Sequence, residues 1–154
     1  MIRTLTVTLA LGTNLGDRAA LLAAARTDLA ATVGPVVAAS RVAETPAWGV
    51  TDQPAFLNQV IVVAYPWPAA AGASVKERLL QLLDRCQAVE QRLGRERKQV
   101  WGPRTCDVDL IFAGDLRLET ARLSLPHPWW AQRDFVGGVI RRELPWVLPP
   151  GSFS

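Results

Sequence analysis

The sequence predicts an α+β fold in which helices pack on one face of a mainly antiparallel sheet. Short stretches in which apolar and polar residues alternate are typical of strands, and two longer stretches have the apolar spacing of amphipathic helices. These stretches follow one another in the order strand, helix, strand, strand, helix, strand. This βαββαβ order is that of the split βαβ unit, so the expected architecture is a ferredoxin-like sandwich.

The first strand is expected at residues 4–11, where leucine and valine alternate with threonine and alanine. The helix that follows is expected to start with Asn14 as its N-cap, and Asp17, three residues later, completes a variant of the capping box. Apolar residues at helical spacing continue to Gly34-Pro35, where the helix should end.

Two strands are expected between the helices, at residues 36–44 and 56–65. The loop between them, residues 45–55, contains proline and glycine. Pro66-Trp67-Pro68 should end the second strand, because proline cannot donate a hydrogen bond to a sheet ladder.

The second helix is expected to begin at a capping box of Ser74 and Glu77 and to end at Gly94. A fourth strand should follow at residues 105–112, with a hairpin around Ala113-Gly114-Asp115. The tail after this hairpin is rich in tryptophan and proline and gives no clear period.

Composition predicts one domain over residues 1–154, since a chain of this length that is 49% hydrophobic can form a single core. The net charge of +3 favours an anionic partner without distinguishing a nucleotide, a phosphate ester or a nucleic acid. Cys86 and Cys106 lack the spacing of a zinc or redox motif, and free thiols fit a reducing compartment. With no signal peptide and no membrane-spanning run, we expect a cytoplasmic protein.

Asp107 and Asp109 lie two residues apart in the expected fourth strand, so both side chains leave the same face. Mg²⁺ commonly uses one or two protein carboxylates and takes its other ligands from water and phosphate oxygens. An Asp-x-Asp pair is more often the solvated face of an edge strand. The neighbouring Arg95, Arg97 and Arg104 favour a polyphosphate site, because guanidinium groups bind phosphate oxygens in a bidentate manner.

Other candidate residues each have an ordinary structural interpretation as well. Glu90 lies on the apolar stripe of the second helix, where it faces either a cleft or an arginine partner. Phe56 and Asn58 share a strand face and suit a flat heterocycle, although a core phenylalanine beside a hydrogen-bonded asparagine is commoner. His127, the single histidine, lies between two prolines and is as compatible with a structural role as with phosphate contact.

Taken together, these motifs resemble the 6-hydroxymethyl-7,8-dihydropterin pyrophosphokinase family. Trp-Gly-Pro-Arg-Thr-Cys-Asp-Val-Asp at residues 101–109 is the most specific of them. The others occur in the family's order along nearly the whole chain: Gly12-Thr13-Asn14-Leu15-Gly16-Asp17, Glu44-Thr45-Pro46, residues 52–58, Leu125-Pro126-His127-Pro128 and Arg133-Asp134-Phe135-Val136. The chain departs from the family pattern at Thr13, where serine is usual, and at Val100, where an arginine commonly precedes the tryptophan.

The resemblance implies a magnesium-dependent enzyme with ATP as co-substrate and diphosphate as the transferred group. It assigns two Mg²⁺ ions to Asp107 and Asp109, and catalytic roles to these aspartates, Arg95 and Arg104. The residues expected to bind ATP are Gln87, Glu90, Arg97, His127 and Arg133. The residues expected to bind the pterin, with stacking between two phenylalanines, are Thr45, Pro46, Trp48, Phe56, Asn58, Trp101 and Phe135.

Two other functional classes stay open on the residues alone. A basic ferredoxin-like sheet can bind RNA, although the glycine and aromatic run of such modules is absent and the aspartate pair would repel a phosphate backbone. Paired aspartates and arginines also serve magnesium-dependent phosphotransferases or nucleases with other substrates. The resemblance favours small-molecule partners, ATP and 6-hydroxymethyl-7,8-dihydropterin, and a monomer that binds neither nucleic acid nor membrane.

Overall fold

The computed structural model describes residues 2–46, 55–68, 72–94 and 106–151. The elements that form the sheet sandwich are β1 (Ile2–Thr13), α1 (Arg18–Thr32), β2 (Val36–Ala39), β3 (Ala43–Thr45), β4 (Phe56–Pro68), α2 (Val75–Gly94) and β5 (Asp107–Ala113). After them come β6 (Leu118–Glu119), β7 (Ser124–Leu125), the π-helical turn η1 (Asp134–Gly138), α3 (Val139–Glu143) and the 3₁₀ turn η2 (Pro145–Val147).

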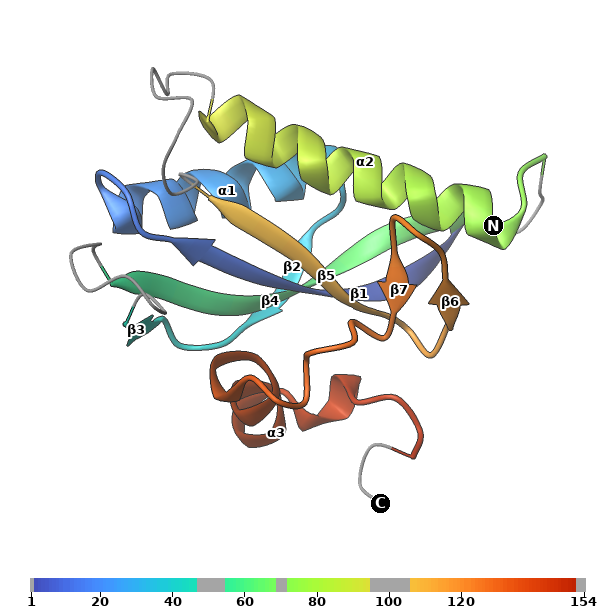
Figure 1. Ribbon diagram of the computed structural model, residues 1–154. Coiled ribbons are helices and arrows are strands. Elements are labelled where there is room, and N and C mark those ends of the chain that lie inside the picture. The colour runs from blue at the N-terminus through green and yellow to red at the C-terminus, as the bar shows by residue number, and fades with distance from the viewer. Residues whose placement is uncertain (1, 47–54, 69–71, 95–105, 152–154) are drawn as a thin grey trace.

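The main sheet has the strand order β2-β4-β1-β5, and β3 also pairs with β4. All of these pairings are antiparallel. This order confirms the expected ferredoxin-like α+β fold. Figure 1 shows α1 and α2 side by side over one face of the sheet, as predicted, and α3 under the opposite face. The third layer below the sheet was not predicted from the sequence.

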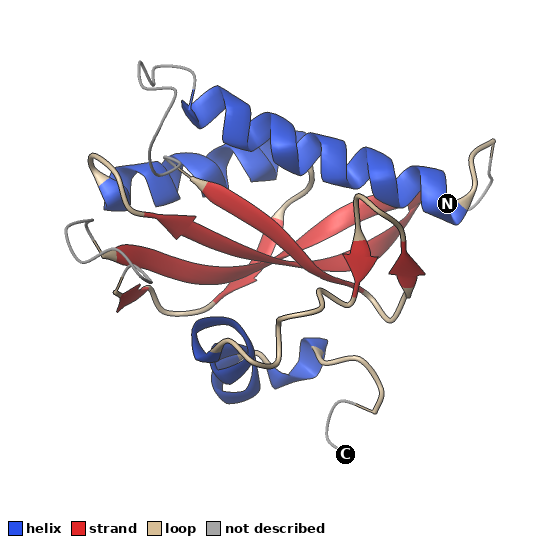
Figure 2. Cartoon of the chain, in the orientation of Figure 1, coloured by secondary structure: helices blue, strands red, loops and turns tan. Residues whose placement is uncertain are grey.

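Two hydrophobic clusters, one on each face, hold the layers together. Side chains such as Leu9, Ile61 and Leu110 pack under α1 and α2. On the other face, the C-terminal segment covers the sheet through contacts that include Val62 and Ile140. The C-terminal segment lies below this face of the sheet (Figure 2). A cavity lies at the end of the face where β1 ends and β4 and β5 begin, which we call the open end of the sheet.

Asp17, and not Asn14, is the N-cap of α1, which corrects the prediction. The Asp17 carboxylate accepts a hydrogen bond from the Ala20 amide at 3.0 Å. Asn14 instead lies fully buried ahead of the helix, because β1 continues to Thr13. The prediction that Ser74 caps α2 is confirmed, since its hydroxyl accepts a hydrogen bond from the Glu77 amide at 3.1 Å.

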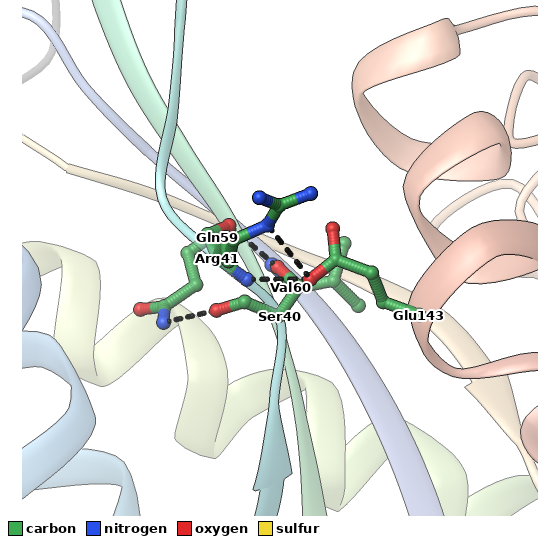
Figure 3. Close-up of polar contacts among 5 residues, drawn as sticks. All are labelled: Ser40, Arg41, Gln59, Val60 and Glu143. Atoms are coloured by element: carbon green, nitrogen blue, oxygen red, sulfur yellow. Dashed lines mark hydrogen bonds and ion pairs between the residues drawn. The ribbon is translucent and has the colours of Figure 1, made fainter.

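The strand expected at residues 36–44 is two strands, β2 and β3, separated at Ser40. The Ser40 hydroxyl accepts a hydrogen bond from the Val60 amide at 3.0 Å, so a side chain replaces a main-chain acceptor in the ladder. The next amide, of Arg41, donates to the Glu143 carboxylate of α3 at 2.9 Å. Figure 3 shows these contacts, which turn the chain out of the sheet and attach it to the C-terminal layer.

Pro66 and Pro68 do not end β4, which continues through Pro68 opposite Ile2. The Ala64 amide points away from β1 and donates to the Pro35 carbonyl. Because alternate residues of a strand orient alike, the missing N–H groups of Pro66 and Pro68 lie on that same outer side, beyond the end of β2. The proline positions therefore interrupt no bond to β1.

The turn at Gly114 is present, with a φ of 57° and a hydrogen bond from the Leu116 amide to the Ala113 carbonyl. The predicted hairpin is wrong in its pairing, because β6 pairs with β7 while β5 pairs with β1.

Among the described helices, none has the length and apolar character needed to cross a bilayer.

Candidate active site

A cavity of about 970 Å³ lies at the open end of the sheet, between the strand ends and the segment that precedes α3. Most of the expected site residues that the structure describes are brought together here. Those that line it are Thr45, Pro46, Phe56, Asn58, Asp107, Asp109, Arg133 and Phe135. The cavity therefore joins an acidic wall, an aromatic pair and a cation.

Asp107 and Asp109 form the acidic wall because they alternate with Val108 and Leu110 along β5. The two apolar residues are buried beneath the helices, so both carboxylates point to the other face. Each aspartate is half-buried and lines the cavity. The predicted juxtaposition of the two carboxylates is therefore a feature of the structure.

Small residues on β1 leave room beside the two aspartates. Gly12 pairs with Asp107 and Ala10 pairs with Asp109 in the sheet. A Cβ atom added at Gly12 would lie 3.4 Å from the Asn58 side-chain oxygen and 3.6 Å from the Phe56 ring. Glycine at this position therefore keeps the floor of the cavity open between the acidic wall and the aromatic side.

Asn58 is oriented by a neighbouring strand. Its side-chain nitrogen donates to the Thr45 hydroxyl at 2.6 Å, and Asn58 is only 7% exposed. β3 brings Thr45 to this place, since Thr45 pairs with Phe56 on β4. The contact uses one of the two N–H donors of the amide and fixes its rotamer, so the remaining polar atoms have a defined direction.

His127 lies close to the acidic wall without lining the cavity. Its ring Nδ1 accepts a hydrogen bond from the Trp129 amide at 3.2 Å, and its own amide donates to the Ile111 carbonyl. Burial lowers the pKa of His127, while Asp109 raises it and Arg133 lowers it. The ring is therefore neutral at about pH 7, with the proton on Nε2.

Glu90 and Gln87 lie on α2 and are not among the residues that line the cavity. The Glu90 carboxylate accepts a hydrogen bond from the Val108 amide at 2.8 Å, between the two aspartates of β5. Gln87 is exposed and accepts a hydrogen bond from Arg122 at 3.1 Å. Glu90 thus fixes the start of β5 from the helical layer through a main-chain amide, a partner that was not among the two alternatives predicted from the sequence.

Five expected site residues lie outside the described part of the chain: Trp48, Arg95, Arg97, Trp101 and Arg104. Sequence reasoning also missed several residues that line the cavity. They are Ala10, Leu11, Gln59, Trp129, Gln132 and Asp134, and Gly12 was noted only as part of a family motif. Trp129, Gln132 and Asp134 lie between or within the two C-terminal motifs, and that proximity was the available signal.

Comparison with known proteins identifies the family. A family model described as 7,8-dihydro-6-hydroxymethylpterin-pyrophosphokinase matches residues 8–142. A protein of Methylorubrum extorquens named 2-amino-4-hydroxy-6-hydroxymethyldihydropteridine pyrophosphokinase is 42% identical over 129 residues, which cover 83% of this chain and 75% of the relative. Proteins of the same name from Porphyromonas gingivalis and Bacillus subtilis are 36% and 37% identical, over 93% and 83% of this chain and 93% and 71% of the relatives. The chain therefore belongs to the 7,8-dihydro-6-hydroxymethylpterin-pyrophosphokinase family.

Proposed function

We propose that this protein transfers the β,γ-diphosphate of ATP to the hydroxymethyl group of 6-hydroxymethyl-7,8-dihydropterin in folate biosynthesis. The products are AMP and the pterin diphosphate. Beyond family membership, one observation supports this function. A single cavity contains both the Asp107 and Asp109 carboxylates and the Phe56 and Asn58 side chains. A metal-polyphosphate site and a heterocycle site therefore adjoin each other.

The acidic wall has the chemistry that Mg²⁺ requires. Asp107 and Asp109 offer carboxylate oxygens side by side, while the described residues contain no group of three or more histidine, cysteine or acidic side chains placed to hold a metal ion. A carboxylate pair fits an ion that keeps several waters and shares phosphate oxygens. We assign two Mg²⁺ ions to this pair, and bound magnesium would neutralise developing charge on the transferring group.

The aromatic side of the cavity suits the pterin. Phe56 and Phe135 both line the cavity and would stack on the two faces of the ring. Asn58, held by Thr45, would read the polar edge of the ring through its amide oxygen and remaining N–H. Pro46 borders this side, and Trp48 and Trp101 are assigned here by family pattern.

The nucleotide side combines a guanidinium and a neutral imidazole. Arg133 lines the cavity and would bind phosphate oxygens in a bidentate manner. His127 would donate from Nε2 to a phosphate oxygen, consistent with its neutral ring. Arg95, Arg97 and Arg104 are assigned to the phosphates by family pattern alone, and Gln87 and Glu90 remain predictions for nucleotide contact.

The remaining expectations also stay predictions. We expect a cytoplasmic monomer, a single domain over residues 1–154, and no nucleic-acid partner. The RNA-binding alternative gains no support from the open end of the sheet, where the acidic pair would repel a phosphate backbone in the absence of metal.

The test of substrate class compares Asn58→Ala with Gln81→Ala. Gln81 is an exposed amide on α2 that does not line the cavity, so it serves as a matched control. Asn58→Ala should raise the KM for the pterin by about tenfold or more and leave the KM for ATP within about twofold, because a buried polar contact to one substrate is lost. Unchanged pterin kinetics in Asn58→Ala would show that the cavity serves another substrate.

A further inference from the structure

Arg18 makes contacts that connect two strands of the cavity, although it does not line the cavity itself. It is the first residue of α1. Its Nη1 donates to the Ala55 carbonyl at 2.7 Å, and its Nη2 lies 3.2 Å from a Glu44 carboxylate oxygen. Ala55 directly precedes Phe56, and Glu44 directly precedes Thr45. The guanidinium therefore joins the residues adjacent to two predicted pterin contacts.

The backbone of Arg18 is held from a third strand. The fully buried Thr13, at the end of β1, donates from its hydroxyl to the Arg18 carbonyl at 3.0 Å. Thr13 is next to Gly12, which forms the floor of the cavity. Arg18 thus links the ends of β1, β3 and β4, and each of these ends contributes a residue to the cavity.

The location of this arginine is unfavourable for the helix that contains it. A positive charge at a helix N-terminus opposes the helix dipole, and only the Asp17 carboxylate at the N-cap offsets it, since the first turn of α1 contains no acidic residue. The Glu44 side chain is 59% exposed, so the ion pair alone contributes little. The short charge-assisted bond to the Ala55 carbonyl is the stronger contact, because a charged donor strengthens a hydrogen bond.

The strand that Arg18 supports is short and has one neighbour. β3 contains three residues and pairs with β4 within the described sheet. Thr45, its last residue, bonds to Asn58 at 2.6 Å. A shift of β3 would lengthen this bond and release the Asn58 rotamer. The position of Thr45 relative to Asn58 therefore depends on the contacts that hold β3.

We infer that Arg18 is a positioning residue for the pterin side of the cavity. It acts through Glu44 and Ala55 on the Thr45–Asn58 pair and on Phe56. Within the part of the chain that the structure describes, no hydrogen bond or ion pair joins Arg18 to the nucleotide side. This inference rests on the proposed function for the identity of the ligand. Its specific consequence is that Arg18 affects pterin binding and leaves ATP binding unchanged.

The experiment compares Arg18→Gln with Arg41→Gln. Arg41 also belongs to an ion pair beside β3, but its side chain is 90% exposed and its partner, Glu143, lies in the C-terminal layer. Arg18→Gln should raise the pterin KM and the equilibrium pterin Kd by about five- to twentyfold, as expected for loss of charged hydrogen bonds, with the ATP KM unchanged. Arg41→Gln should leave both constants unchanged. Pterin Kd is read from the fluorescence of the pterin and needs no turnover.

Two milder variants distinguish the effect of the bridge that the Arg18 guanidinium forms between Glu44 and Ala55 from the effect of its positive charge. Glu44→Gln keeps the bond to Ala55 and should raise the pterin Kd by less than about threefold. Arg18→Lys keeps the charge but replaces the two-pronged guanidinium with a single ammonium, so it should recover only part of the affinity. Full recovery in Arg18→Lys would show that charge alone matters and would overturn the bridging role. If Arg18→Gln fails to fold by circular dichroism, these two variants give the result.

Several outcomes would overturn the inference. A folded Arg18→Gln with a lower Tm and normal pterin Kd would mean that Arg18 is only structural. Equal increases in the constants for pterin and ATP would mean that it acts on the whole cavity. If the wild-type protein binds pterin but forms no AMP, the proposed reaction fails while the effect of Arg18 on pterin Kd still decides the inference. A wild-type protein that binds no pterin would overturn both.

Discussion

At the scale of single residues, the cavity depends on alternation along β5. Asp107 and Asp109 reach the same cavity because Val108 and Leu110 are buried on the opposite face. The Glu90 carboxylate fixes the amide between the two aspartates. The acidic pair is therefore oriented by the core beneath it, and a change of charge alone should leave that orientation intact.

Replacing either aspartate should remove turnover without unfolding the protein. We expect Asp107→Asn and Asp109→Asn each to lower kcat about a hundredfold or more, since charge stabilisation at the transferring group is lost. Kinetics with saturating ATP and magnesium measure the effect, and circular dichroism checks the fold. Asp115→Asn, in the exposed turn after β5, is the control and should keep normal turnover. Near-normal kcat in an Asp107 or Asp109 variant would contradict the magnesium assignment.

At the scale of secondary-structure elements, Ser40 decides where β2 ends. Its hydroxyl bonds to the Val60 amide, its carbonyl accepts from the Gln59 side chain, and the next residue is attached to Glu143 (Figure 3). The crossover from β2 to β3 is thus joined to β4 and to the C-terminal layer at one point.

Ser40→Ala should lower the free energy of unfolding by about 1–3 kcal/mol, because the buried Val60 amide loses its acceptor. Urea denaturation measures this loss. Ser124→Ala in β7 is the control, since the described part of the chain gives its hydroxyl no hydrogen bond, and it should change the free energy by less than about 0.5 kcal/mol. An equal effect in the two variants would show that the Ser40 bond does not contribute specifically.

The elements with a clear period could be predicted from the sequence. β1 and β5 alternate, and the apolar spacing of α1 and α2 marks the face that packs on the sheet. The break at Ser40 could not be predicted, because it depends on contacts with Val60 and Glu143 that are distant in sequence. For the same reason, Asp17 could be recognised as the cap only once β1 was known to extend to Thr13.

The candidate site was predictable where its residues share one strand face, as Phe56 and Asn58 do. Trp129, Gln132 and Asp134 were missed because the chain around them has no regular period and reaches the cavity through tertiary packing. Arg18 gave no signal either, since its partners Glu44 and Ala55 are brought to it by strand pairing.

At the scale of the whole molecule, the reactivity of the two cysteines tests how tightly the helices pack on the sheet. Cys86, on α2, and Cys106, which directly precedes β5, are both buried free thiols in the core between the helices and the sheet. Burial raises the pKa of Cys86 to about 12, with Glu90 contributing in the same direction. Burial likewise raises the pKa of Cys106 to about 12, with further contributions from Asp107 and Glu90.

Both thiols should therefore stay unreactive toward a disulfide reagent such as DTNB in the folded protein at about pH 8, and react after unfolding in urea. The unfolded chain releases these protons above the ordinary pKa of 9.0, whereas the folded chain retains them. Stability from this source is complete below pH 9.0 and falls as pH rises toward about 12. Fast labelling of a thiol in the native protein would contradict the buried placement.

The central claim is that the cavity transfers a diphosphate to a pterin. The most direct measurement incubates the purified protein with ATP, Mg²⁺ and 6-hydroxymethyl-7,8-dihydropterin and identifies the products by phosphorus NMR. We predict equal amounts of AMP and pterin diphosphate, and neither product when the pterin is omitted. Formation of ADP with a pterin monophosphate, or of AMP without pterin, would contradict the assignment.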